Sequence, residues 1–280
     1  MSGLTKRFKW LATPYLLWSV GFTVIPLIVI VRYALTDDTG AFTLSNITAI
    51  ADPIHARAFL FSLEIALGCT LICILLAYPL VMAFRRLRLS RGKFMMFVLI
   101  LPMWMNFILR LLAWQMLLSS NGIINNLLMR LGLSPLKIAN TWTAVMIGVV
   151  YEYLPFVVLP IYNAVMDIDK GVIEAAKDLG AGSMRTFWRV IFPLSMPGLK
   201  SGITMVFVPS MTSFVIADLL GGGKLQLIGN VIEQEFTHSM NWHLGSGLSV
   251  ALMVFVLASM ALTVKSENNV EEDRKNWEES

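Results

Sequence analysis

The chain has 280 residues, of which 56% are apolar and only 14% are charged, and its formal net charge is +4. A typical globular domain is about 25% charged, so a composition this poor in ions does not cover a water-facing surface. It excludes a disordered chain and argues against nucleic-acid binding, because the excess positive charge is small. We therefore expect a chain that lies mostly in lipid.

Six segments are apolar and long enough to cross a bilayer as helices, since about 20 residues span about 30 Å. They cover about 11–31, 58–84, 94–118, 139–166, 194–220 and 244–264. The first is longer than the apolar stretch of a signal peptide and no A-x-A site follows it, so we expect a retained span. The sequence predicts an all-α membrane protein with one six-span domain, residues 11–265, between polar tails at 1–10 and 266–280.

Lys and Arg are distributed unequally between alternate loops, which orients membrane proteins with their positive loops inside. The side that carries both termini holds 15 of them: Lys6, Arg7, Lys9, Arg85, Arg86, Arg88, Arg91, Lys93, Lys170, Lys177, Arg185, Arg189, Lys265, Arg274 and Lys275. The opposite loops hold five: Arg32, Arg57, Arg130, Lys137 and Lys224. We expect a multi-pass protein of the cell (inner or plasma) membrane with cytoplasmic N- and C-termini.

Two cysteines and three histidines could suggest a metal site or a disulfide. Cys69 and Cys73 lie four residues apart in an apolar run, a spacing that does not suit a disulfide within a regular helix. The histidines, His55, His238 and His243, lie in outer loops and do not form a convincing cluster. We expect the cysteines to be small packing residues, and we expect neither a metal nor another cofactor.

The connection between the fourth and fifth spans, residues 167–193, has the periodicity of a helix rather than of a plain loop. One apolar face is formed by Val172, Ile173, Ala176 and Leu179. Asp169 is a possible N-cap, and Gly180 suits the left-handed residue that often follows a helix. Ser183 can begin a second short helix that carries Phe187. The segment predicts a cytoplasmic helix–Gly–helix element, which either lies on lipid headgroups or docks a partner protein.

A motif in this segment resembles the EAA motif of ABC importer permeases. It consists of Glu174-Ala175-Ala176, then Gly180, then Val190-Ile191-Phe192-Pro193, where that family usually has Ile-x-Leu-Pro. Further stretches resemble the first permease subunit of the spermidine/putrescine importers. They are Asp178-Leu179-Gly180-Ala181, Pro193-Leu194-Ser195-Met196-Pro197-Gly198, Asp218-Leu219-Leu220-Gly221-Gly222 and Leu227-Ile228-Gly229-Asn230-Val231-Ile232.

The resemblance implies a type I importer fold in which two homologous permeases pair with a cytoplasmic ABC ATPase dimer. An extracytoplasmic solute-binding protein would deliver the polyamine. The residues implied to couple the permease to the ATPase are Glu174, Ala175, Ala176, Asp178, Leu179, Gly180 and Phe187. Among them, Glu174 would contact the ATPase and Gly180 would permit the bend. The chain is thus expected to be a transport subunit and no enzyme, since its sequence contains no G-x-x-x-x-G-K-[ST] phosphate loop.

Placing an ionisable residue inside the membrane costs free energy, so such a residue is expected to have a structural or functional role. A polyamine is a polycation, and carboxylates and aromatic faces can replace its water during transport. The expected pathway residues are Glu64, Tyr151, Glu152, Tyr153 and Asp218. The alternative is an ion pair of Glu152 or Glu64 with Arg110, which would only stabilise packing.

Several functions and contacts stay open from the sequence. The chain could be a permease for another small solute, a gradient-driven secondary transporter that uses the membrane carboxylates as a proton relay, or a non-transporting scaffold. The G-x-x-x-G step of Gly198 and Gly202 permits close helix approach either to a neighbouring span or to a sister subunit.

Overall fold

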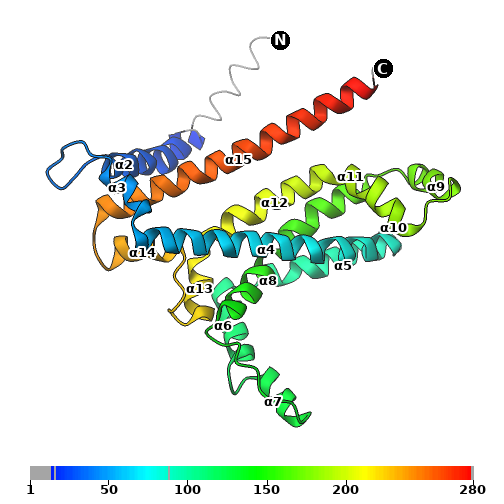
Figure 1. The fold of residues 1–280 in the computed structure, drawn as a ribbon, viewed down its shortest axis with the longest axis horizontal. Helices are drawn as coiled ribbons and strands as arrows, with labels where there is room; N and C mark the ends of the chain where they lie inside the picture. Colours follow the sequence, from blue (N-terminus) through cyan, green and yellow to red (C-terminus); the bar gives the residue numbers. More distant parts are fainter. Residues whose placement is uncertain (1–13, 16, 88, 279–280) are drawn as a thin grey trace. The chain divides into compact units, whose positions relative to one another are not determined.

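A computed structural model describes residues 14–15, 17–87 and 89–278 of the chain (Figure 1). In these residues the regular secondary structure is helical, apart from an isolated bridge between Thr36 and Phe42. The all-α prediction is therefore confirmed. The chain divides into two compact units: residues up to 57 with 231–257, and residues 58–230 with the chain from 258.

The first unit contains the helices before residue 57 and parts of two later ones. Its elements are η1 (Val20–Val24), α2 (Ile25–Ala34), α3 (Ser45–Thr48) and η2 (Ala49–Ala51), with parts of α14 (Ile228–Thr237) and α15 (Trp242–Glu278). Asn46 closes the C-terminal end of α2, because its amide donates to the carbonyl oxygens of Tyr33, Ala34 and Thr36. Such bonds satisfy carbonyls that have no partner within the helix.

The second unit contains the remaining helices. They are α4 (Pro53–Arg86), α5 (Leu89–Ile100), η3 (Leu101–Trp104), α6 (Phe107–Leu118), α7 (Ile123–Arg130), α8 (Trp142–Met166), α9 (Lys170–Asp178), α10 (Ser183–Thr186), η4 (Phe187–Ile191), α11 (Phe192–Leu194), α12 (Met196–Met211) and α13 (Phe214–Gly221). Cys69 and Cys73 of α4 are buried thiols without a disulfide, with their sulfur atoms 3.8 Å apart, as expected for packing residues.

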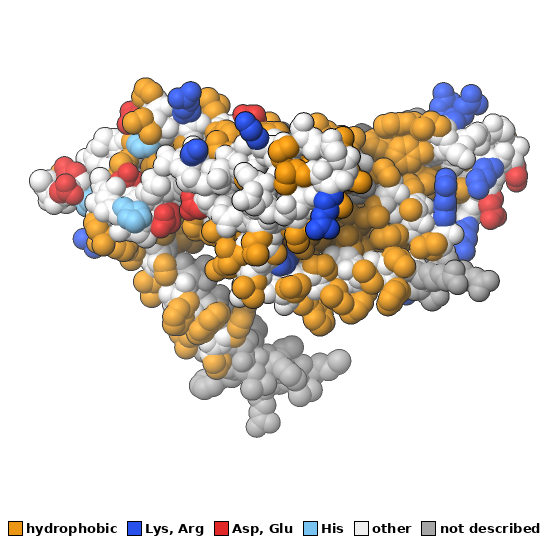
Figure 2. Space-filling view, turned by 90° about the horizontal axis from the view of Figure 1, so that it is seen from below, with side chains coloured by type: hydrophobic (Ala, Val, Ile, Leu, Met, Phe, Trp, Pro, Cys, Tyr) orange, Lys and Arg blue, Asp and Glu red, His pale blue; other side chains and the backbone are white. Residues whose placement is uncertain are grey.

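Five helices are long and apolar enough to cross a membrane, or up to six if a bent pair is one span. They are Leu17–Ala34, Pro53–Arg86, Phe107–Arg130, Trp142–Met166 and Trp242–Ala261, and the bent pair is Ser183–Leu194 with Met196–Met211. Large apolar side chains cover much of the face in Figure 2. Near α9 and α10, at the right of that view, Lys, Arg, Asp and Glu side chains replace them.

The expected span at 94–118 is not one continuous helix. α5 passes into the 3-10 turn η3 at Pro102, and Met105 is extended before α6 begins. Proline lacks the N–H that an α-helix needs, and Asn106 restarts the helix by accepting a hydrogen bond from the Leu109 amide at 3.2 Å.

The expected span at 194–220 is also broken. α12 ends at Met211, two residues after Pro209, and α13 starts at Phe214. Irregular backbone at membrane depth occurs where protein buries it or where it lines a cavity.

The polar tail expected from 266 is helical in the part that the structure describes. The α15 helix continues to Glu278, so this segment extends the last helix. The tail at 1–10 and the first residues of the first span lie outside the described residues.

Close packing in the second unit centres on α8, which α12 and α13 contact. A Cβ atom on Gly198 would lie 2.4 Å from the Pro160 carbonyl oxygen, and one on Gly202 would lie 3.2 Å from the Val157 Cα. These glycines therefore let α12 approach α8, which is the neighbouring-span alternative for the G-x-x-x-G step.

Candidate functional site

The expected coupling helix is α9, and its ends have the predicted caps. The Asp169 side chain accepts a hydrogen bond from the Gly171 amide at the N-terminus. At the C-terminus Gly180 has a φ of 81°, its amide donates to Lys177, and the Ala181 amide donates to Ala176. This pair of bonds is a Schellman motif, which favours glycine because its left-handed residue disfavours a Cβ atom.

The apolar face of α9 is divided between the protein and its surroundings. Ile173 packs against the core of the second unit, whereas Leu179 is 89% exposed. Glu174, Ala175 and Asp178 are also exposed, and Ala176 is half-buried. The motif carboxylates and Leu179 thus remain available to another molecule.

An aromatic cluster joins this segment to α4. Its members are Tyr78, Phe187, Trp188 and Phe192. The Phe187 ring meets Tyr78 edge-on at 5.5 Å between centroids, and the Tyr78 hydroxyl lies 3.0 Å from that of Ser195. Phe187 is half-buried, so it connects the segment to the spans rather than presenting a free surface.

Arg85 is a site residue that sequence reasoning missed. Its guanidinium donates to the carbonyl oxygens of Val165 at 2.6 Å and Ile168 at 3.2 Å. The Val165 carbonyl lies in the last turn of α8 and the Ile168 carbonyl in the connection to α9, so Arg85 ties α4 to the start of the coupling segment. The sequence showed Arg85 only as one of several cations in a loop. The one signal that could have identified its role is its position at the end of a span.

Glu152 lies in a buried ion pair between α6 and α8. Arg110 donates to its Oε1 atom over 2.9 Å, and the side chains are 7% and 11% exposed for Arg110 and Glu152. The Glu152 Oε2 and Arg110 Nε atoms have no hydrogen-bond partner among the described residues. The structure thus contains the ion pair that the sequence offered as the alternative, with one carboxylate oxygen left over.

The two tyrosines beside Glu152 point to different helices. Tyr151 meets Trp114 of α6 edge-on at 5.2 Å between ring centroids. The Tyr153 hydroxyl lies 2.7 Å from that of Ser213 and donates to the Pro209 carbonyl oxygen over 3.3 Å. Tyr153 therefore stabilises the irregular backbone between α12 and α13.

The other two expected pathway carboxylates are not members of this ion pair. Asp218 on α13 accepts a hydrogen bond from Asn230 over 2.7 Å, and Asn230 in turn accepts one from the Leu227 amide. Glu64 is exposed on α4. The described residues include no group of three His, Cys, Asp or Glu side chains that could hold a metal ion.

Comparison with known proteins decides the family. The family model described as "Binding-protein-dependent transport system inner membrane component" matches residues 70–266, which include the whole coupling segment. The chain belongs to this family. It is therefore a multi-pass membrane permease, a transport component and no enzyme.

Sequence similarity to known relatives covers most of this permease. It is 39% identical over 247 residues to the spermidine/putrescine transport system permease protein PotB of Haemophilus influenzae, covering 85% of this chain and 86% of that one. It is 38% identical to PotB of Escherichia coli, covering 85% and 89%. A more distant relative, the inner membrane ABC transporter permease protein YdcU of Escherichia coli, is 29% identical, with 80% and 75% covered.

A solved structure has the same fold. A chain of a bacterial alginate ABC transporter, crystallised with a periplasmic protein that holds an alginate pentasaccharide, superposes with a TM-score of 0.78. The superposition covers 94% of both chains at 16% sequence identity. This permease therefore has the fold of an ABC importer permease, as the sequence predicted.

Proposed function

We propose that this permease is one of two homologous transmembrane subunits of an ATP-driven polyamine importer that carries spermidine and putrescine. The observation that carries the proposal is its 38–39% identity to two PotB permeases over 85% of its length. The buried carboxylate of Glu152 supplies a group that suits a polycation.

The partners of this importer are a cytoplasmic ABC ATPase dimer, the second permease and an extracytoplasmic solute-binding protein. The excess of Lys and Arg in alternate loops favours cytoplasmic termini, with α9 on the same side. Lipid surrounds the apolar faces of the spans.

The coupling segment, residues 167–193, acts as a rigid element between the ATPase and the spans. Glu174, Ala175, Asp178 and Leu179 lie on its exposed side, where an ATPase groove can hold them. Arg85 and the Phe187 cluster fix its opposite side to α4 and α8. A rigid-body shift of α9 therefore moves the flanking helices α8 and α12, and so switches access between the two sides of the membrane.

The polyamine pathway uses carboxylates and aromatic rings at membrane depth. Glu152, Tyr151 and Tyr153 belong to α8, and Glu64 and Asp218 contribute carboxylates from α4 and α13. Arg110 pairs with Glu152 when no substrate is bound, since a buried charge needs a partner. The unpartnered Oε2 atom can accept a hydrogen bond from an ammonium group.

Reconstitution tests this function. The permease is purified with its ATPase, second permease and binding protein, and labelled spermidine uptake into proteoliposomes is measured with and without ATP. We expect uptake that requires ATP and persists when an ionophore collapses the proton gradient. Uptake that follows the gradient and ignores ATP would instead indicate a secondary transporter, and uptake of another solute alone would overturn the polyamine assignment.

A further inference from the structure

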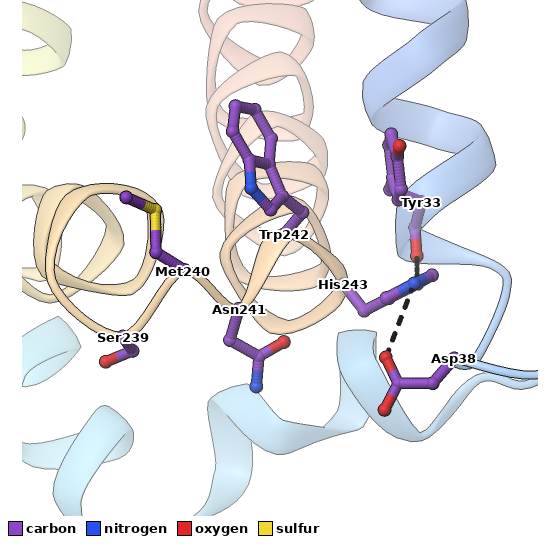
Figure 3. Close-up of a pocket in the computed structure, with 7 residues that line it drawn as sticks. All are labelled: Tyr33, Asp38, Ser239, Met240, Asn241, Trp242 and His243. Atoms are coloured by element: carbon purple, nitrogen blue, oxygen red, sulfur yellow. Dashed lines mark hydrogen bonds and ion pairs between the residues drawn. The ribbon is translucent and has the colours of Figure 1, made fainter.

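The first unit contains a pocket of its own. It has a volume of about 430 Å³ and is lined by Tyr33, Asp38, Ser239, Met240, Asn241, Trp242 and His243 (Figure 3). Ligand pockets have volumes of about 300–1,000 Å³. The proposed orientation places this pocket on the outer side of the membrane, where a solute arrives.

The loop that forms one wall is held in shape by local hydrogen bonds. The amides of His238 and Ser239 donate to the Gln234 carbonyl oxygen, and the Asn241 amide donates to that of Glu235. The Asn241 side chain then caps α15 by accepting from the Leu244 amide at 3.0 Å. This wall is therefore built before any ligand binds.

The two aspartates of the opposite loop have different roles. Asp37 accepts hydrogen bonds from its own turn, from the Thr39 amide and hydroxyl and from the Ala41 amide. The Thr39 hydroxyl, more than any other group, holds the Asp37 pKa below its ordinary value. Asp38 makes no such bonds in the described structure: it is 97% exposed and lies at the pocket beside His243.

His243 and Asp38 lie together at the pocket. The His243 Nδ1 atom lies 3.0 Å from the Tyr33 carbonyl oxygen, which can only accept, so Nδ1 donates to it. The Nε2 atom lies 3.6 Å from the Asp38 Oδ1 atom (Figure 3), and it is an acceptor in the tautomer whose one proton is on Nδ1. A donor with several N–H groups can satisfy both atoms at once.

Aromatic rings complete this arrangement. Trp242 is 53% exposed and Tyr33 is 38% exposed, with their ring centroids 6.4 Å apart. Aromatic faces attract ammonium groups. The residues lining the pocket include one carboxylate and neither Lys nor Arg, so its charge favours a cation over an anion.

We infer that this pocket is an entry site that binds one ammonium group of the polyamine, between the Asp38 carboxylate, the His243 Nε2 atom and the rings of Tyr33 and Trp242. The inference rests on the proposed function and on the proposed orientation. It adds a site at the ends of the candidate spans Leu17–Ala34 and Trp242–Ala261, where the solute binds before it enters the pathway.

Photocrosslinking tests the site on the complete importer in nanodiscs. A spermidine analogue with a photoreactive group at one end is activated by light, and labelled peptides are measured by mass spectrometry. We expect labelling of residues 239–243, competition by unlabelled spermidine, and about two- to fivefold less labelling in Asp38→Asn. His243→Asn should also lower the labelling, since Asn keeps a donor for the Tyr33 carbonyl and lacks the Nε2 atom.

A matched control is Asp52→Asn, which removes a carboxylate that is 66% exposed and does not line the pocket. It should keep the labelling of the native protein. Absent labelling of 239–243, or equal labelling in Asp38→Asn, would overturn the site even if the same preparation transports spermidine with ATP. A preparation that transports no spermidine overturns the proposed function, and the site with it.

Discussion

Two single residues have distinct structural roles in this permease. Gly180 permits the bend after α9 through its left-handed backbone, and Arg110 neutralises Glu152 inside the second unit. Each has a single physical task, so a substitution at either position gives a sharp test.

Replacing Gly180 with Val should abolish coupling. A Cβ atom at Gly180 meets nothing within 4 Å, so its φ of 81° is the only obstacle. A left-handed non-glycine residue costs about 1–3 kcal/mol, and a β-branched one fits worst. We expect ATP-dependent uptake to fall at least tenfold. Membrane insertion should be unchanged, so the variant should resist extraction from the membranes as the native protein does.

The matched control is Gly182→Val, two residues further along the chain. Gly182 also has open space around it, but its φ is −65°, which Val adopts without strain. This variant should retain most of its uptake. If Gly180→Val transports as well as Gly182→Val, the bend is not part of the coupling mechanism.

The ion pair can be separated into a packing role and a pathway role. Arg110→Met leaves the Glu152 charge buried alone, which costs about 3–5 kcal/mol and should lower the thermal unfolding temperature. The double variant Arg110→Met, Glu152→Met replaces the pair with apolar side chains and should recover most of that stability. We expect it to fold and yet to transport spermidine at least tenfold more slowly, and normal transport by the double variant would make Glu152 purely structural.

At the scale of elements, the sequence predicted helices, caps and the coupling segment because local rules decide them. Asp169 and Gly180 occupy the predicted positions since a cap depends on neighbours along the chain. The positions of the helix breaks after Pro102 and Pro209 are harder to predict from composition, because apolar residues continue on both sides of each break. Long-range partners, such as Arg85 with Val165, depend on how helices pack and could not be predicted from one sequence.

Arg85 should stabilise the coupling segment more than another loop residue of the same charge does. Arg85→Met leaves the Val165 and Ile168 carbonyls without their donor, and a hydrogen bond to a charged group contributes about 1.5–3 kcal/mol. We expect faster proteolysis within residues 167–182 and reduced uptake. Arg86→Met removes the same charge from the neighbouring exposed position and should leave both measurements near those of the native protein. Equal effects of the two variants would indicate that only loop charge matters.

At the scale of the whole molecule, the permease is a membrane component whose energy source lies on another chain. Composition predicted the membrane, and the EAA-type segment predicted the family, which the family match over residues 70–266 confirms. The pocket at Trp242 and His243 was not predicted, because its walls come from segments about 200 residues apart that each read as ordinary loops. Its recognition needed the three-dimensional arrangement.

The central claim is that an ATPase holds the exposed side of α9. A photoreactive amino acid at position 179, whose native side chain is 89% exposed, tests it directly in membranes that contain the complete importer. The account predicts a crosslink from position 179 to the ATPase, stronger than one from the buried position 191. Crosslinks from position 179 to lipid alone would contradict it.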